Sequence, residues 1–217
     1  MLVSQNTLGS LQFSFSTDVH VIKDYYDIVK NVYRNEMHIR NINLPEVDPD
    51  EFDFQSDFLI ILSNGVCVGG ARITTSYPKN KNLIPLENEN FPLSTFIPDL
   101  QYHAYSEISR LAVLPEFRKQ GLVADLFRYI IIRSLDNNIS SIFAKSSKIH
   151  TINYRRSIKK LGLDINCFNY PFKNDFLNTR YKKNLVMLCL KDVTNSSNGQ
   201  FQRLTPKAQD QTLTLVA

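Results

Sequence analysis

The sequence predicts an α/β (α+β) fold in which helices pack on a central sheet. Two stretches carry this prediction. The runs 58–62 and 66–75 are apolar and flank Asn64-Gly65, the dipeptide that favours a tight β-hairpin. Residues 105–133 have the pattern of a buried strand closed by Pro115, a short basic loop containing Gly121, and a long amphipathic helix.

The other elements follow from local patterns in chain order. Residues 11–16 alternate like a first strand, and Thr17-Asp18 is a cap for an amphipathic helix that runs to about His38. Residues 80–98 carry three prolines and predict an extended loop. Residues 141–145 and 185–190 predict further strands, and a helix over 149–161 ends at Gly162.

Length and composition predict one domain over residues 1–192, followed by a disordered tail over 193–217 that is poor in apolar residues. The net charge of +4 is modest and aromatic residues are not interleaved with basic runs, which argues against nucleic-acid binding. The sequence has no secretory leader and no apolar stretch near the roughly 20 residues that span a bilayer. We therefore expect a cytoplasmic monomer without integral membrane contact.

Three cysteines, Cys67, Cys167 and Cys189, stand singly in apolar surroundings, and the four histidines are scattered. Neither residue type is spaced as metal ligands are. We expect free, buried thiols and no metal site.

The start of the helix after Gly121 is a candidate anion site. Free backbone N–H groups, the positive end of the helix dipole, Arg118 and Lys119 converge there. Gly121 also removes a side chain that would hold an anion away from the backbone. The alternative is an ordinary strand-turn-helix with a solvated basic loop.

A second candidate site comes from charges inside apolar strands. Arg72 lies in the second hairpin strand, and Glu107 and Arg110 lie in the strand before the basic loop. Buried arginines require carboxylate or phosphate partners, and the acidic stretch 45–53 supplies carboxylates. The resulting cluster either fixes this stretch against the sheet or binds a zwitterionic amine, with arginine on its carboxylate and acids on its ammonium.

Residues 111–127, LAVLPEFRKQGLVADLF, resemble motif A of the GNAT superfamily of N-acyltransferases. Arg118, Gly121 and Val123 take the positions of R/Q-x-x-G-x-G/A, with valine at the last. The resemblance implies a GNAT-like fold, with a mixed, mostly antiparallel twisted sheet whose central strands splay apart between flanking helices. It also implies that the donor, coenzyme A or the phosphopantetheine of an acyl carrier protein, is bound by Leu111, Ala112, Val113, Arg118, Lys119, Gln120, Gly121, Leu122 and Val123.

A further resemblance covers the charged residues. The patterns D-x-D-x-F-D at 48–53, G-G-A-R at 69–72 and S-E-I-S-R at 106–110 are similar to acyl-homoserine lactone (autoinducer) synthases and related N-acyl amino acid synthases. Val29 and Ile39 stand where the lactone synthases have Arg and Trp, which favours an ordinary amine acceptor. The resemblance implies an acceptor site made of Tyr33, Asp48, Asp50, Asp53, Arg72 and Ser109.

Three residues are the catalytic candidates. Glu107 is either the general base for the amine or an ionised structural partner of the arginines. A backbone N–H at or just after Arg110 is expected to polarise the thioester carbonyl. Many GNAT enzymes protonate the leaving thiolate with a tyrosine where this chain has Ile158, and Tyr154 lies one turn earlier on the same helix face.

The prediction is an N-acyltransferase that moves a medium- or long-chain fatty acyl group from acyl carrier protein or acyl-CoA to an amino acid or peptide amine. Residues 80–98 either line an acyl tunnel or pack as filler. One alternative is an acetyl-CoA-dependent N-acetyltransferase of a small amine or protein lysine. The other is a non-catalytic relative that binds acyl-pantetheine.

Overall fold

The computed structural model describes residues 11–36, 49–97, 99–169 and 183–190. Within these residues, seven strands form one sheet in the order β1-β2-β3-β4-β5-β7-β6. All neighbouring strands are antiparallel except β4 and β5, which are parallel. The strands are β1 (Leu11–Ser16), β2 (Ser56–Ser63), β3 (Val66–Ser76), β4 (Ala104–Val113), β5 (Ile139–Ser147), β6 (Asn166–Asn169) and β7 (Lys183–Cys189).

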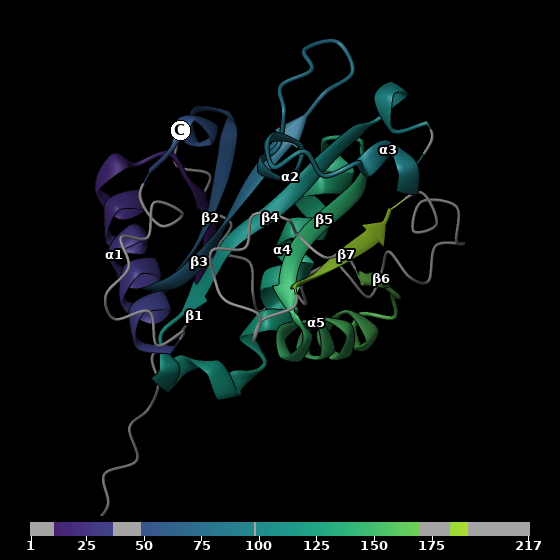
Figure 1. Ribbon diagram of the computed structural model, residues 1–217. Coiled ribbons are helices and arrows are strands. Elements are labelled where there is room, and N and C mark those ends of the chain that lie inside the picture. The colour runs from purple at the N-terminus through teal and green to yellow at the C-terminus, as the bar shows by residue number, and fades with distance from the viewer. Residues whose placement is uncertain (1–10, 37–48, 98, 170–182, 191–217) are drawn as a thin grey trace, which may run out of the picture.

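Helices cover both faces of the sheet (Figure 1). Helix α1 (Val19–Glu36) packs on one face, over β2 and β3, where it meets Phe58 and Ile60. Helices α4 (Leu122–Asp136) and α5 (Lys148–Lys160) share the opposite face with Leu59 and Ile61. Because side chains alternate along a strand, one apolar strand serves both layers. The predicted fold class is confirmed.

Local signals set the first elements as predicted. The Oδ1 atom of Asp18 accepts the backbone N–H of His20 at 2.8 Å and so caps α1. Asn64 and Gly65 both have positive φ angles, 51° and 79°, as a type I′ turn between β2 and β3 requires. The turn dipeptide and the cap therefore act as the sequence indicates.

The central strands separate partway along their length. Strand β4 pairs with β5 from Ala104 to Ile108, where the last pair is Ile108 with Ala144. Beyond that point β4 continues to Val113 beside β3, and β5 continues to Ser147 beside β7. This divergence, visible in Figure 1, is the splay expected from the GNAT resemblance.

The segment between β3 and β4 is more regular than the predicted extended loop. It contains α2 (Pro85–Asn88), α3 (Leu93–Phe96) and the 3-10 turn η3 (Leu100–Tyr102). Leu86 and Phe91 are buried against Phe143 and Met187 of the sheet, and Phe96 packs at the edge of the same cluster. These side chains therefore cover the sheet over β5 and β7.

The C-terminal elements are partly as expected. Helix α5 ends in a Schellman motif, in which Gly162 has φ 79° and Leu163 N–H bonds the Ile158 carbonyl at 3.3 Å. Strand β7 was predicted as 185–190, whereas the short strand β6 was not predicted, because four residues carry too little periodicity. The predicted tail, residues 193–217, lies outside the described residues.

The three cysteines are free. Cys67 is buried, and burial raises the pKa of its thiol to about 11, so this thiol is unreactive at neutral pH. Cys167 and Cys189 are half-buried rather than buried as expected. Across the described ranges, no helix is long and apolar enough to cross a bilayer, and no three His, Cys, Asp or Glu residues gather as metal ligands would.

Candidate active site

Asp50 and Asp53, which lie just before β2, form ion pairs with Arg72 of β3. Asp50 caps the 3-10 turn η2 (Glu51–Gln55) by accepting the Phe52 N–H at 3.0 Å, which places both acids above β3. The Nη1 atom of Arg72 lies 2.6 Å from Asp50 Oδ1 and 2.7 Å from Asp53 Oδ1. Burial alone would lower the pKa of Arg72, but the two carboxylates outweigh it and the pKa is raised.

Arg110 shares the same two acids from the next strand. Its Nη2 lies 2.8 Å from Asp50 Oδ2, and its Nη1 lies 3.6 Å from Asp53 Oδ1. Nη1 also donates to the hydroxyl of Tyr26 on α1, and the guanidinium lies 5.0 Å from the centre of that ring. The predicted electrostatic cluster is therefore formed by two acids and two arginines, but Glu107, which was predicted to share it, instead accepts the backbone N–H of Leu86.

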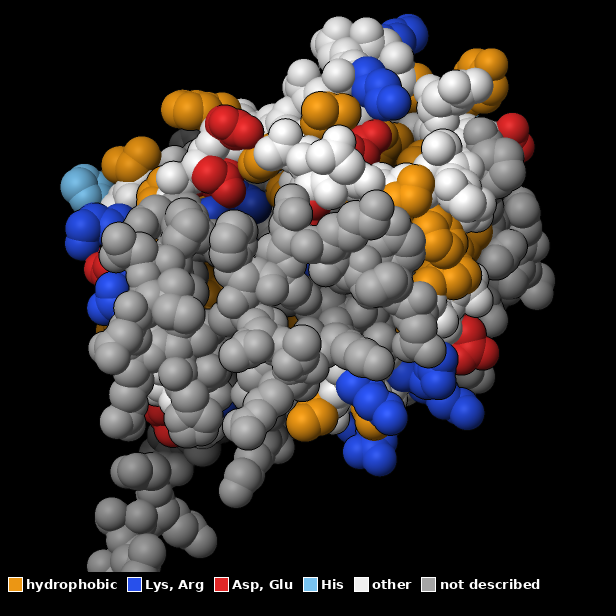
Figure 2. All heavy atoms as spheres, in the orientation of Figure 1, with side chains coloured by type: hydrophobic (Ala, Val, Ile, Leu, Met, Phe, Trp, Pro, Cys, Tyr) orange, Lys and Arg blue, Asp and Glu red, His pale blue; other side chains and the backbone are white. Residues whose placement is uncertain are grey.

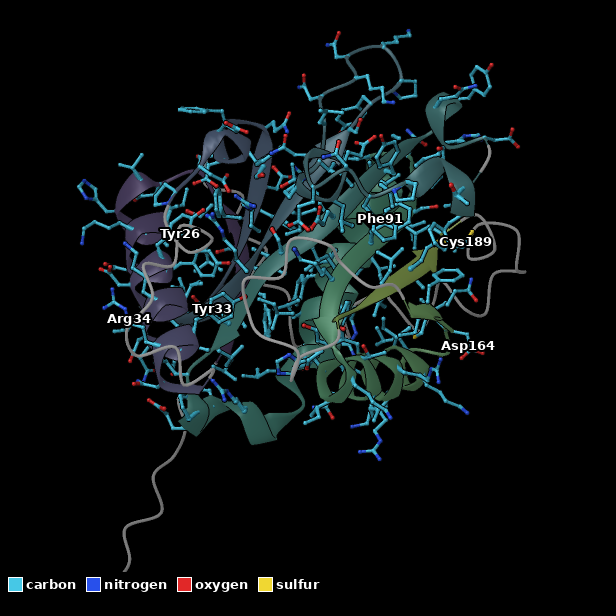
Figure 3. All side chains as sticks on the ribbon, in the orientation of Figure 1. Tyr26, Tyr33, Arg34, Phe91, Asp164 and Cys189 are labelled. Carbon is cyan, nitrogen blue, oxygen red and sulfur yellow. The ribbon has the colours of Figure 1, made fainter. Side chains whose placement is uncertain are left out.

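Tyr26 completes the cluster, and sequence reasoning missed it. Its hydroxyl donates to Asp53 at 2.7 Å, and burial raises the pKa of the phenol well above its ordinary value. Tyr26 lies beside the apolar stripe of α1, next to Asp27, where a surface position was equally compatible with the sequence. Figure 3 shows Tyr26 and Tyr33 on the sheet side of α1, with Arg34 on the other side.

The cluster is closed on its arginine side and open on its acid side. The side chains of Arg72 and Arg110 are 3% and 4% exposed, whereas that of Asp50 is 33% exposed. An incoming ligand therefore meets a carboxylate before it meets either guanidinium. This geometry fixes the η2 segment to the sheet, and it leaves an acidic rim that suits an ammonium group.

The other acceptor candidates lie at the edges of this cluster. Ser109 accepts a hydrogen bond from Arg72 Nε at 3.0 Å. Tyr33 is half-buried on α1. It lies on the same face of the helix as Val29, which is fully buried. Asp48 and Ile39 lie outside the described residues.

Glu107 is buried outside the cluster that Asp50 and Asp53 form with the two arginines. It is 3% exposed, and its Oε2 accepts the backbone N–H of Leu86 at 2.8 Å. Burial raises the pKa of Glu107 to about 7, while the Leu86 N–H and the charges of Lys145 and Arg72 oppose that rise. The carboxyl group is thus poised to exchange a proton near neutral pH.

The backbone of β4 is bulged at Arg110. Gly70 pairs with Ala112 and Arg72 pairs with Ser109, so one residue of β3 faces two residues of β4. Arg110 has φ 53°, a left-handed conformation that costs a non-glycine residue about 1–2 kcal/mol. The bulge therefore lies at the residue where a backbone N–H donor was expected.

The predicted donor loop follows directly. Val113 ends β4, and its carbonyl accepts a hydrogen bond from Arg118 Nε at 2.7 Å. Gly121, with φ 77°, precedes α4, and a Cβ atom built there would meet no described atom within 4 Å other than those of its chain neighbours. In the described part of the loop, the space beside Gly121 that anion binding by backbone N–H groups requires is therefore free.

The remaining donor candidates divide by burial. Ala112 and Leu122 are buried, while Leu111 and Val123 are partly buried and pack against the core. The side chains of Lys119 and Gln120 lie outside the described part of the structure.

Tyr154 lies on α5, across the splay from α1. Its ring packs edge-on against Phe127 with centroids 5.2 Å apart. Burial, and then the neighbourhood of Tyr33, raise the pKa of the Tyr154 phenol well above its ordinary value.

Comparisons with known proteins agree with the fold. Residues 30–128 match the family model described as an acetyltransferase (GNAT) domain. The N-acyl amino acid synthase FeeM from uncultured soil microbes superposes with a TM-score of 0.61 at 11% identity, over 84% of this chain and 92% of that one. No curated protein sequence matches the chain.

Two lactone synthases superpose with similar scores. The CoA-dependent acyl-homoserine lactone synthase BjaI has a TM-score of 0.61 at 16% identity, over 91% of this chain and 92% of that one. The acyl-homoserine lactone synthase LasI has a TM-score of 0.58 at 15% identity, over 83% and 89%. The protein therefore has the GNAT acyltransferase fold, and the resemblance to both synthase families is confirmed at the level of that fold.

Proposed function

We propose that the protein transfers a fatty acyl group from a thioester to the amine of an amino acid or peptide. The observation that carries this proposal is the placement of Glu107, whose pKa is about 7. It lies one residue before the pairing between β4 and β5 ends at Ile108, and three residues before the bulge at Arg110. A base and a backbone N–H donor then lie on one strand, beside the diverging strands that would admit a pantetheine arm.

The reaction we propose is a direct acyl transfer. The amine nitrogen bonds to the thioester carbon, the carbon–sulfur bond breaks, and the sulfur leaves as a thiolate. An acceptor that arrives as its ammonium ion first releases one proton to solvent. As the free amine attacks, Glu107 takes the second proton from the nitrogen, directly or through water, and Tyr154 gives one proton to the thiolate. Proton exchange with solvent then returns both side chains to their starting states. The raised pKa of Tyr154 means that its phenol is protonated at neutral pH, although the same shift makes it a weaker acid.

The acceptor side is supported by the acidic rim of the cluster. Asp50 and Asp53 suit the ammonium group of the acceptor, and the two arginines hold those acids in place. An acceptor carboxylate would have to compete with Asp50 for the arginines, so we assign recognition of the amine to this rim. The named neighbours FeeM, BjaI and LasI make N-acyl products of amino acid or lactone type, which supports an amine acceptor of that class.

The donor side is supported by a basic helix face. Helix α5 contains no acidic residue, and its exposed cations are Lys148, Arg155, Arg156, Lys159 and Lys160. Figure 2 shows Lys and Arg side chains gathered over this helix, at the same end of the sheet as the segment Pro115–Gln120 in Figure 1. Charge complementarity favours an acidic acyl carrier protein as the donor, with acyl-CoA as the alternative.

One experiment tests the reaction directly. Purified protein is incubated with acyl carrier protein and coenzyme A thioesters of several chain lengths, each with a mixture of amino acids, and the products are measured by mass spectrometry. A new N-acyl amino acid is the expected result. Formation of N-acetyl products alone supports the acetyl-CoA alternative, and binding of acyl-pantetheine without any product supports the non-catalytic one. A cytoplasmic, monomeric enzyme remains part of this proposal.

A further inference from the structure

Tyr25 holds the backbone of Arg110. The Tyr25 hydroxyl donates to the Arg110 carbonyl, with an oxygen–oxygen distance of 2.6 Å. Tyr25 is fully buried on α1, and burial raises the pKa of its phenol well above its ordinary value. The phenol therefore remains protonated, and it serves as a hydrogen-bond donor throughout the neutral pH range.

This carbonyl belongs to the bulge of β4. Arg110 adopts a positive φ there, so the surrounding structure must hold the conformation. Two adjacent tyrosines do so from the same helix: Tyr25 binds the carbonyl and Tyr26 binds the guanidinium, which Asp50 also holds. Both ends of Arg110 are therefore fixed by α1 and the η2 segment.

The ring of Tyr25 has a fitted place in the core. It packs edge-on against Phe58 with centroids 6.1 Å apart. A Cβ atom on Gly70 would lie 3.1 Å from the Tyr25 ring and 2.4 Å from the Leu59 carbonyl oxygen. The absence of a side chain at Gly70 thus lets α1 bring the Tyr25 hydroxyl to β4.

The direction of the Arg110 carbonyl determines the direction of the next N–H. In a trans, planar peptide the C=O and the following N–H point in opposite directions. The N–H of Leu111 therefore points away from Tyr25. The edge of β4 that faces β5 has no pairing beyond Ile108 in the described residues, so it borders the space into which the two strands diverge.

We propose that Tyr25 is a positioning residue for acyl transfer, because its bond to the Arg110 carbonyl aims the Leu111 N–H at the carbonyl oxygen of the donor thioester. This inference rests on the proposed function and adds a residue that touches neither substrate. The N–H stabilises the negative charge that develops on that oxygen as the amine attacks. Tyr25 acts only through the peptide that it orients.

The test is Tyr25→Phe, which removes the hydroxyl and keeps the ring in the core. We expect kcat to fall roughly 10- to 100-fold, while KM for donor and acceptor changes less than about 2-fold, since the lost interaction forms in the transition state. The pH profile should keep its shape, because Glu107 is untouched. The matched control is Tyr129→Phe on α4, which should retain wild-type kcat.

A second, spectroscopic experiment examines the bound donor directly and does not depend on turnover. Binding of the donor also shows that the variant is folded. Octanoyl-CoA carrying ¹³C at the thioester carbonyl is bound without acceptor, and the carbonyl stretching band is recorded by infrared difference spectroscopy. A hydrogen bond from Leu111 lowers this frequency, so Tyr25→Phe should raise it relative to wild type, and p-aminophenylalanine at position 25, which restores a donor, should lower it again.

The outcomes separate this inference from the proposed function. Wild-type kcat and an unshifted carbonyl band in Tyr25→Phe overturn the role of Tyr25 and leave the transferase intact. A rise in KM with unchanged kcat also overturns it. Absence of N-acyl product from the wild-type protein with every donor overturns the proposed function itself.

Discussion

The Oδ2 atom of Asp50 lies 2.8 Å from Nη2 of Arg110, so an acid that precedes β2 is tied to the bulge of β4. The other oxygen of the same carboxylate binds Arg72, one strand away. A single side chain thus joins the acceptor rim to the two strands that carry the catalytic candidates. We therefore expect changes to this small set of charges to affect stability, and catalysis if the proposed function holds.

Asp50→Asn should weaken this connection. Each arginine keeps Asp53 but loses half of its carboxylate partners while remaining buried, so the free energy of unfolding should fall by about 1–3 kcal/mol. Asp57→Asn is the matched control, because Asp57 pairs with Arg133 at 3.4 Å on the surface, and it should cost less than about 1 kcal/mol. Urea denaturation measures both, and equal losses would contradict a special role for Asp50.

Glu107→Gln tests the proposed base. Because the pKa of Glu107 is about 7, the fraction that accepts a proton rises with pH through that value. We expect wild-type kcat to rise with pH up to about 7, and the variant to lose about 100-fold together with this acidic limb. Profiles of kcat against pH decide the matter. A variant that keeps both its rate and its limb leaves Glu107 with a structural role only.

The same residue predicts a pH dependence of stability. Burial raises the pKa of Glu107 from its ordinary value of 4.5 to about 7, so the folded protein holds this proton more tightly than the unfolded chain. The free energy of unfolding of wild type should therefore decrease, relative to Glu107→Gln, as pH rises from about 4.5 to about 7, by at most roughly 3 kcal/mol. Denaturation of both proteins at several pH values measures the difference. Parallel curves would exclude the pKa shift.

Gly70→Ala should be among the most damaging small substitutions. Its Cβ atom would lie 2.4 Å from the Leu59 carbonyl oxygen, and neighbouring strands cannot shift apart without breaking their pairing. We expect a loss of about 2–4 kcal/mol in the free energy of unfolding. Gly65→Ala, at φ 79° but in open space, should lose only about 1 kcal/mol. Thermal unfolding compares the two, and similar losses would contradict the packing argument.

Charge reversal on α5 should separate the two donors. The double variant Arg156→Glu and Lys159→Glu changes exposed side chains and leaves the core of the helix intact. We expect kcat/KM to fall at least about 10-fold with an acyl carrier protein donor at low salt, and less than about 2-fold with the same acyl group on coenzyme A.

Arg118→Glu should also cost more with the carrier protein than with coenzyme A, because it reverses a charge in the donor loop. Arg118 bonds the Val113 carbonyl as well, so this substitution disturbs the end of β4. The α5 variant avoids that disturbance. Equal losses with both donors in that variant would count against a carrier protein docked on α5.

Much of the fold followed from short-range signals. Asn64-Gly65 predicted a hairpin, Asp18 predicted the start of a helix, and Gly162 predicted the end of a helix. Each signal acts within a few residues, through backbone conformation or a local hydrogen bond. The two short helices within residues 85–96 were not predicted, because a segment of four residues is too short to show a hydrophobic period. Packing of their apolar side chains against the sheet holds them in place.

The sequence by itself determined which charges require partners: apolar strands containing Arg72, Glu107 and Arg110 imply a buried cluster, because isolated charges are too costly to bury. Only the tertiary structure decided the pairing. It gave both arginines to Asp50 and Asp53, placed Glu107 against the Leu86 N–H, and brought Tyr25 and Tyr26 from α1 to Arg110. These contacts join residues up to 85 positions apart, and no local preference encodes such distances.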